Sequence, residues 1–254
     1  MIDIHCHILP SVDDGASSMT DSIEMARAAA DQGITAIIAT PHNKNGKYDT
    51  PIEIVEEKVH ALNKELNHHS IPITVFPGHE TRIFGEMLEE YRAGNVLTLN
   101  GSQYVFIEFP SQHVPRYAGQ MIYDLKLEGL SPIIVHPERN QELISDPDRL
   151  YKLVEKGALT QVTAASVTGH FGKKIKKFTN QLIEHNLTHF IASDAHNTSS
   201  RGFHLRDAYE TVEKEFSISY RYMFEENTTL LMDNKAIFPE FPERIKKKKF
   251  LGIF

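Results

Sequence analysis

Two histidines stand two residues apart at the start of the chain, in the sequence MIDIHCH. His5 and His7 flank Cys6, the only cysteine among the 254 residues. Side chains in a strand alternate between its two faces, so His5 and His7 are predicted to point to one side and Cys6 to the other. Two imidazoles on one face can bind one metal ion together. The stretch therefore predicts one edge of a metal site rather than a thiol centre.

The same residue types recur where later apolar stretches end. The further candidate ligands are His42, Glu80, Glu108, His136, Asp194 and His196. A single histidine at a strand end is usually structural, but the joint pattern indicates a metal site. Imidazole and carboxylate ligands without thiolates suit Mn, Fe or Zn. Eight ligands exceed the needs of one ion, so we expect two or three divalent ions, an arrangement that favours hydrolysis of phosphate esters.

Loops after these stretches offer further candidates. Of the pair Asp13 and Asp14 in SVDDGAS, Asp14 is the favoured ligand of a third ion, and the alternative is a turn before the first helix. Arg139 in HPERN and Arg206 in GFHLRDAY are predicted to hold phosphate oxygens, and the alternative for both is an ion pair. The last candidates, which either line the substrate entrance or belong to a plain loop, are Arg116 and Tyr117.

Short stretches rich in Ile and Val alternate with longer amphipathic stretches, which predicts βα units and a mostly parallel sheet. The predicted strands are 2–7, 35–42, 73–80, 104–110, 132–138, 159–166 and 189–196. The predicted helices are 19–33, 51–67, 117–129, 146–157, 173–186 and 205–216. This spacing favours a closed or nearly closed βα barrel, in which the C-terminal ends of the strands build the site.

Composition limits the classes of protein that remain. Lys and Arg number 27 and Asp and Glu 34, so the net charge is −7, which argues against broad nucleic-acid binding. One cysteine permits no internal disulfide and indicates a reducing, cytoplasmic location. Met1 leads directly into the first strand, and no run of 18 apolar residues occurs, so we expect neither a signal peptide nor a membrane span.

No linker divides the chain, so residues 1–240 are predicted to form a single catalytic domain, followed by a basic and apolar tail at 241–254. The tail ends in PERIKKKKFLGIF. One interpretation is a solvated end; the other is docking to an anionic membrane face or to a membrane-bound kinase.

Taken together, DIHCHILPSVDDGA, ATPH, PGHE, IEFP, HPERN and SDAHN resemble the motifs of the polymerase and histidinol phosphatase (PHP) superfamily. They are most similar to bacterial manganese-dependent tyrosine-protein phosphatases found beside capsule and exopolysaccharide genes. The resemblance runs from residue 1 to about residue 240 and implies a distorted seven-stranded βα barrel, the PHP fold, with a trinuclear centre. It also implies ligand sets for the three ions, which are His5, His7, Glu80 and Asp194; Glu80, Glu108 and His136; and Asp14, His42 and His196.

The resemblance implies a function as well. Phosphotyrosine would be hydrolysed by hydroxide formed at the metal ions, with Arg139 and Arg206 on the phosphate and no phosphoenzyme. The implied substrate is an autophosphorylated tyrosine kinase, and the implied process is exopolysaccharide control. The alternatives are a small-molecule phosphatase such as a histidinol phosphatase, and a regulatory partner of a tyrosine kinase without turnover. A proofreading exonuclease is disfavoured because the chain is acidic and has no second domain.

Overall fold

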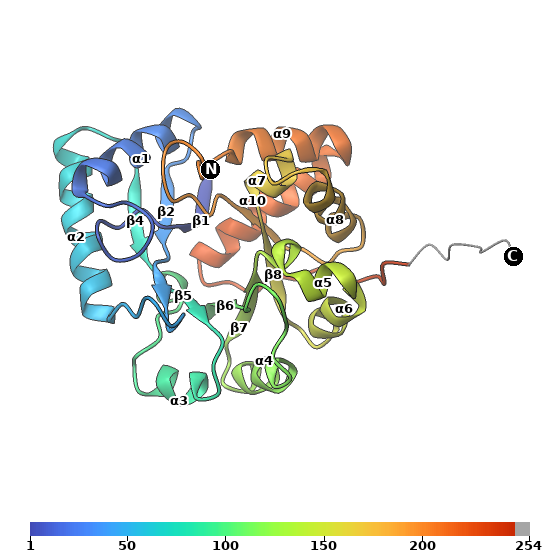
Figure 1. Cartoon of the computed structure of the whole chain (residues 1–254). Coiled ribbons are helices and arrows are strands. Elements are labelled where there is room, and N and C mark those ends of the chain that lie inside the picture. The colour runs from blue at the N-terminus through green and yellow to red at the C-terminus, as the bar shows by residue number, and fades with distance from the viewer. Residues whose placement is uncertain (247–254) are drawn as a thin grey trace, which may run out of the picture.

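The structure is a computed structural model that describes residues 1–246, and Figure 1 shows its arrangement of parallel strands and surrounding helices. One sheet has the order β1-β2-β4, with β1 (Ile2–Cys6), β2 (Ala36–Ala39) and β4 (Thr74–Pro77). The second sheet has the order β3-β5-β6-β7-β8-β9, with β3 (His42–Asn43), β5 (Glu80–Arg82), β6 (Tyr104–Glu108), β7 (Ser131–Val135), β8 (Leu159–Thr163) and β9 (Phe190–Ala192). Every pairing between these strands is parallel, as the βα pattern predicted.

Two of the predicted strands are divided in the structure. The stretch 35–42 becomes β2 and β3, and the stretch 73–80 becomes β4 and β5. Pro41 has no N–H to donate to a ladder. At Gly78 a Cβ atom would lie 2.9 Å from the side chain of Ile38, so the two segments approach too closely for a larger residue. The breaks transfer His42 and Glu80 to the second sheet, where they are direct register partners.

The two sheets meet beside the first strand. Cys6 and Ala195 form an isolated parallel bridge, so the segment that follows β9 pairs with β1. His7 donates its N–H to the carbonyl of Ala195 at 2.9 Å, and Asp194 donates to the carbonyl of His5 at 2.9 Å. These bonds place the end of β1 and residues 194–196 side by side.

The six predicted helices are present, and their ends differ from the predicted ends by at most two residues. They are α1 (Met19–Asp31), α2 (Ile52–His68), α4 (Ala118–Leu127), α6 (Pro147–Glu155), α8 (Lys173–Glu184) and α9 (Leu205–Glu215). None of the helices in residues 1–246 is both long and apolar enough to cross a membrane. The structure adds short helical segments that the pattern did not predict, namely α3 (Met87–Arg92), η1 (Leu99–Gly101), η2 (Pro137–Arg139), α5 (Gln141–Ser145) and α7 (Ala164–Thr168).

The longest helix that the pattern missed is α10 (Ile218–Met232). Its buried residues include Asn227 and Thr228 beside Phe224 and Leu231, so no clean apolar stripe marks it in the sequence. The predicted strand 159–166 ends early because the side chain of Thr163 accepts from the N–H of Ser166 and caps α7.

Apolar side chains form two buried clusters. The larger cluster fills the space between the sheets and the helices and includes Cys6. The smaller cluster lies among the strands and contains residues such as Ile4, Phe106 and Phe190. The first part of the predicted tail, 241–246, contacts the domain, since Glu243 donates its N–H to the carbonyl of His185 at 2.8 Å. The rest of that tail, 247–254, lies outside the described residues.

Candidate metal centre

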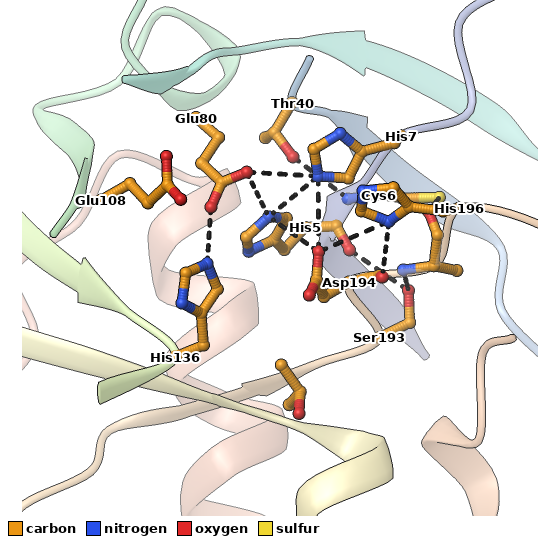
Figure 2. Close-up of polar contacts among 12 residues, drawn as sticks. His5, Cys6, His7, Thr40, Glu80, Glu108, His136, Ser193, Asp194 and His196 are labelled. Carbon is orange, nitrogen blue, oxygen red and sulfur yellow. Dashed lines mark hydrogen bonds and ion pairs between the residues drawn. The ribbon is translucent and has the colours of Figure 1, made fainter. Parts of the chain in front are cut away.

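The nine predicted ligands gather at the C-terminal ends of the strands, and Figure 2 shows most of them converging. Two lie in β1 and β6, two open the short strands β3 and β5, two directly follow β1 and β7, two lie in the segment after β9, and one lies in the loop before α1. In chain order they are His5, His7, Asp14, His42, Glu80, Glu108, His136, Asp194 and His196. The parallel order of the strands explains the convergence, because their C-terminal ends share one edge.

The centre of the group is formed by two histidines and two carboxylates. The Nε2 atoms of His5 and His7 lie 3.4 Å apart. Each lies 3.3–3.5 Å from Glu80 Oε2 and from Asp194 Oδ1. These distances exceed those of good hydrogen bonds. Four ligand atoms placed about 2.1 Å from a shared ion in a tetrahedron lie roughly 3.4 Å apart, so the spacing fits a common ion.

A second set of ligand atoms lies on the other side of His7. Asp14 Oδ1 is 3.4 Å from His42 Nε2 and 3.4 Å from His196 Nε2. The rings of His7 and His196 are stacked with their centroids 3.7 Å apart. His7, Asp14, His42 and His196 therefore offer ligand atoms within reach of one ion. This set contains the three residues that the family resemblance implies, with His7 added.

The third set surrounds the outer side of Glu80. His42, Glu80 and Glu108 have ligand atoms close enough together for one ion. His136, which the resemblance implies in this set, places its Nε2 atom 2.6 Å from Glu80 Oε1. His42 Nδ1 lies 2.9 Å from Glu80 Oε2. Glu80 thus contacts all three sets, and the assignment of individual ligands to individual ions stays a prediction.

Unpaired buried atoms mark the same place. The atoms that are buried and lack a hydrogen-bond partner within residues 1–246 include Glu80 Oε2, Asp194 Oδ1, His196 Nε2 and His42 Nδ1. Leaving a buried polar group unpaired costs about 1–3 kcal/mol, and more when the group is charged. Oxygen and nitrogen atoms that share one small volume without hydrogen bonds fit divalent metal ions. The residues present therefore fit a centre of two or three such ions.

Two further residues contact the rings of His5 and His7 at the nitrogen that faces away from the other ligands. Asp13 Oδ2 lies 2.6 Å from His7 Nδ1, and Gln161 Oε1 lies 2.9 Å from His5 Nδ1. An acceptor on Nδ1 keeps the proton there and leaves Nε2 free to bind a metal. Asp13 is one of the two loop carboxylates that the sequence offers as a ligand, whereas Gln161 is not predicted from the sequence. A polar residue inside the apolar stretch LTQVT was the available signal.

Arg139 lies at the centre, as predicted. The left-handed backbone of His136, with φ of 36°, turns the chain into η2 and brings Arg139 back toward the strand ends. Its Nη1 lies 2.7 Å from Asp194 Oδ2, and its guanidinium lies 5.6 Å from the ring centre of Phe171. Beside it is a cavity of about 240 Å³ that Glu108 also lines.

The prediction for Arg206 is wrong. Its guanidinium donates to the carbonyl oxygens of Asp31 at 2.6 Å and Gln32 at 3.2 Å, at the end of α1. The neighbouring Gly33 binds the amino group of Met1 at 2.9 Å. Arg206 therefore lies beside the start of β1, at the opposite end of that strand from the ligands. The cause is the loop before α9, which carries the start of this helix to the end of α1.

Arg201 occupies the place that the sequence analysis gave to Arg206. Its Nη2 lies 3.3 Å from Asp194 Oδ2, and its Nη1 lies 3.6 Å from Asp14 Oδ2. His196 and Asn197 both donate their N–H groups to the carbonyl of Arg201, which folds this loop back onto the centre. Arg139 and Arg201 thus flank Asp194 with side chains 27% and 34% exposed, which leaves both able to meet a ligand.

The remaining candidates lie at the rim. Tyr117 is 42% exposed and donates its hydroxyl to the carbonyl of Ile83 at 3.2 Å, just beyond β5. Arg116 is exposed next to it. Arg82, which the sequence analysis missed, binds Glu108 with two nitrogens at 2.8 and 2.9 Å. Lining of the entrance by residues 116 and 117 stays a prediction.

Electrostatics favour the ligand forms of Glu80 and His136, but not the carboxylate form of Glu108. Burial raises the pKa of Glu80, but the histidines that contact it lower it further, so this pKa stays well below its usual range. Burial, assisted by the charge of Arg139, lowers the pKa of His136 to about 4. Burial and the charge of Glu80 raise the pKa of Glu108 to about 7. Glu80 is thus an anion and His136 a neutral imidazole, the forms that bind metals.

Cys6 points away from the ligands, as the alternation of side chains predicted. Its Sγ lies 3.6 Å from the carbonyl of Ala195, and it is fully buried in the larger apolar cluster. Burial raises the pKa of this thiol well above its usual value. A buried thiol that stays protonated is a poor nucleophile.

Several known proteins are similar to this chain in sequence over its whole length. A model of the family described as "Capsular polysaccharide synthesis, CpsB/CapC" matches residues 1–234. The tyrosine-protein phosphatase YwqE of Bacillus subtilis is 52% identical over 254 residues, with both chains fully covered. The putative tyrosine-protein phosphatase CapC of Staphylococcus aureus is 36% identical, again with both chains fully covered.

Solved structures agree with the sequence relatives. One, from work on YwqE of Bacillus subtilis and CpsB of Streptococcus pneumoniae described as unique metal-dependent tyrosine phosphatases, has a TM-score of 0.95 and 52% identity. It covers 97% of this chain, and this chain covers all of it. An organophosphorus hydrolase variant, with a TM-score of 0.54 and 12% identity over 91% of this chain and 92% of its own, shares the fold alone. The chain belongs to the CpsB/CapC capsular polysaccharide synthesis family.

Proposed function

We propose that this protein is a metal-dependent phosphatase that hydrolyses phosphotyrosine in proteins. The observation that carries the proposal is the set of unpaired histidine and carboxylate atoms at the strand ends, flanked by two arginines. The relatives named as tyrosine-protein phosphatases support this choice of substrate. The chemistry needs no thiolate, in agreement with the buried Cys6.

The nine ligands would hold two or three divalent ions, for which manganese is our first choice and iron or zinc the alternatives. Such ions lower the pKa of a water molecule to supply hydroxide near neutral pH, and they offset charge on the phosphate oxygens. Arg139 and Arg201 would bind phosphate oxygens and hold the phosphorus in place for attack. Asp13 and Gln161 would keep the two central imidazoles in the tautomer that leaves Nε2 free.

The leaving group explains why no general acid is prominent. A phenol has a pKa of about 10, so the phenolate of tyrosine departs without the protonation that a serine alkoxide needs. The rim residues Arg116 and Tyr117 would contact the peptide around the phosphotyrosine. A membrane-associated, autophosphorylated tyrosine kinase is the protein substrate that we propose, with the phosphatase acting in the cytoplasm. Control of exopolysaccharide or capsule synthesis is the process, and the name of the family supports it.

We also propose that the two sheets together form the distorted seven-stranded barrel of the PHP fold. The bridge between Cys6 and Ala195 supports this, since it joins β1 of the first sheet to the chain that follows β9 of the second. The in-register pair of His42 and Glu80, where the two divided strands continue into the second sheet, also supports it. Seven strand positions then become nine short strands through the two breaks.

The experiment is a comparison of phosphate release from three substrates by one preparation: a phosphotyrosine peptide, the matching phosphoserine peptide and histidinol phosphate. Metal content is measured on the same preparation before and after chelation. We expect turnover of the phosphotyrosine peptide, its loss on chelation, and recovery when manganese is returned. Preference for histidinol phosphate would replace the proposal with the small-molecule alternative, and metal-loaded protein without turnover of any ester would favour a regulatory partner.

A further inference from the structure

An exposed apolar side chain, Phe171, lies at the edge of the metal centre. It belongs to the short connection between α7 and α8 and is 38% exposed. Its ring centre lies 5.6 Å from the guanidinium carbon of Arg139, which in turn contacts Asp194 at 2.7 Å. A phenylalanine in this position keeps part of its apolar surface in water unless a ligand covers it. The ring is therefore available to whatever Arg139 binds.

The backbone of this connection is fixed by two glycines. Gly169 and Gly172 have φ of 90° and 91°, a left-handed conformation that residues with a Cβ atom rarely adopt. The carbonyl of Ala165 accepts the N–H groups of both Gly169 and His170, which ends α7. Gly172 donates its N–H to the carbonyl of Gly169 at 2.9 Å, which closes a turn that contains Phe171. The sequence TGHFG thus presents the ring from a closed turn.

The side chain of His170 ties this turn to the loop before α9. Its Nδ1 atom lies 2.8 Å from the hydroxyl of Thr168, and its ring stacks on that of His204 with the centroids 3.9 Å apart. His204 directly precedes α9 and belongs to the loop that carries Arg201. Figure 1 shows α7 beside α8 and α9, and α7 packs against both helices. The turn with Phe171 is therefore fixed to the loop that supplies Arg201.

Tyr48 and Tyr117 also lie near the centre, but both already have partners. The ring of Tyr48 is stacked parallel to that of His42, and Lys47 Nζ lies 4.6 Å from its centre. Tyr117 donates its hydroxyl to a backbone carbonyl beyond β5. On Phe171, within residues 1–246, a single guanidinium packs and no second ring or cation does. Of these three aromatic residues, Phe171 has the ring that is most open to a ligand.

We propose that Phe171 is a specificity-determining residue that packs against the phenol ring of phosphotyrosine while Arg139 binds the phosphate. This role rests on the proposed phosphatase function and deepens it, because it explains a preference for aromatic phosphate esters. A single oxygen joins the phosphorus of phosphotyrosine to its ring, so a phosphate held by Arg139 places the ring next to Phe171. Two aromatic rings in contact stabilise a complex beyond the apolar area that they bury. Phosphoserine has no ring and leaves Phe171 uncovered.

The test uses two probes that carry the same phosphonate group, one with a ring and one without. Benzylphosphonate and butylphosphonate bind without being hydrolysed, so calorimetry measures their dissociation constants on manganese-loaded, full-length protein. Turnover of a phosphotyrosine peptide is measured on the same preparation. The variants are Phe171→Ala, Phe171→Leu and Phe171→Tyr. The matched control is Phe238→Ala, since Phe238 is 91% exposed and lines a cavity with His189 at the opposite end of the strands.

We expect the native chain to bind benzylphosphonate more tightly than butylphosphonate. Phe171→Ala should reduce this preference about three- to tenfold, which is the contribution of an aromatic pair. KM for the phosphotyrosine peptide should rise by a similar factor and kcat should change by less than about twofold, because the ring is held equally in the ground state and the transition state. Phe171→Leu should also reduce the preference, although it keeps an apolar side chain. Phe171→Tyr and Phe238→Ala should keep the native preference.

An equal loss of affinity for both phosphonates in Phe171→Ala would overturn the proposal, because the ring would then only support Arg139. So would a native preference that survives in both Phe171→Ala and Phe171→Leu. Melting temperature and metal content, measured on every variant, show that the fold and the centre are intact. A native chain that binds the two phosphonates equally but hydrolyses the phosphotyrosine peptide would remove the role of Phe171 alone. A native chain that binds neither phosphonate and hydrolyses no phosphate ester would remove the phosphatase proposal as well.

Discussion

The two ends of the parallel strands treat buried polar groups in opposite ways. At the C-terminal end, Glu80 Oε2 and Asp194 Oδ1 are buried without a hydrogen-bond partner. At the N-terminal end, His189 Nδ1 accepts from the N–H of Thr160 at 3.0 Å, and Asn227 donates to the carbonyl of His189 at 2.8 Å. Tyr104 similarly donates its hydroxyl to the carbonyl of Lys235 at 2.6 Å.

The difference separates function from stability. Pairing at the N-terminal end satisfies each donor or acceptor with a backbone group, so those residues stabilise the fold. Several buried atoms at the C-terminal end lack a hydrogen bond of good geometry, which costs the metal-free protein stability, and a bound metal ion would offset that cost. Substitutions at the two ends should therefore have different effects, the first on metal binding and turnover, the second on the free energy of unfolding.

The largest effect is expected for Glu80→Gln. Glu80 contacts all three ligand sets, and an amide neither carries the charge nor bridges ions as a carboxylate does. Metal ions stabilise the transition state of phosphate hydrolysis by several kcal/mol, so we expect their loss to lower kcat/KM by at least about 10³-fold. Phosphotyrosine-peptide turnover and metal content are the measurements, with Glu210→Gln on the exposed face of α9 as the control. Retention of both by Glu80→Gln would end the idea that the unpaired atoms mark the centre.

At the opposite end, His189 should make stability depend on pH. Burial lowers its folded-state pKa to about 4 from 6.5. Between these values the unfolded chain binds a proton that the folded chain does not, so the free energy of unfolding falls as pH falls through this window. Once the pH has fallen through this window, the free energy of unfolding is lower by about 3 kcal/mol. Above pH 6.5 His189 causes no such loss.

Denaturant unfolding of the native chain and of His189→Asn, at several pH values, measures this dependence. Asparagine keeps an acceptor for Thr160 but does not titrate, so its curve should be flatter between pH 4 and pH 6.5. His113→Asn, at an exposed position, serves as the control and should follow the native curve. Parallel curves for the native chain and the His189 variant would show that His189 carries no such penalty.

Arg201 and Arg206 allow the two ends of the strands to be compared with one type of substitution, because Arg201 lies at the ligand end and Arg206 at the opposite end. Arg201→Ala should lower kcat/KM on a phosphotyrosine peptide by about 10²-fold, because a charge-assisted contact to phosphate is lost. Arg206→Ala should change it by less than about twofold, because its guanidinium binds the end of α1. The two assays are run side by side at equal metal loading. A larger loss for Arg206→Ala than for Arg201→Ala would restore Arg206 as the arginine that binds phosphate.

A smaller effect on metal binding is expected for Gln161, which contacts the ligand His5 on the side away from the metal ions. Gln161→Leu removes the acceptor that orients His5 but leaves every ligand in place. Metal affinity should fall by roughly tenfold, which is the smaller of the effects seen when a residue that hydrogen-bonds to a metal ligand is replaced. Metal titration followed by activity at saturating metal separates the two effects, because turnover should recover when metal is added in excess. Turnover that stays low with full metal occupancy would place Gln161 in the reaction itself.

Much of the centre was predictable because the signal was local. His5 and His7 share a face through strand geometry alone, and six of seven predicted strands end in a candidate ligand. The longer helices were predictable for the same reason, except α10, which buries Asn227 and Thr228 and so lacks an apolar stripe. The divided strands were missed because close packing around Gly78 involves Ile38, forty residues earlier.

The sequence by itself determined the ligand types, their order along the strands and the orientation of Cys6 away from them, because alternation and parallel βα order act over a few residues. Only the tertiary structure decided which arginine meets the centre. Arg201 and Arg206 are five residues apart, yet the first returns to His196 through backbone hydrogen bonds and the second binds the end of α1. Loop paths depend on bonds between distant segments, and spacing in the chain does not contain them.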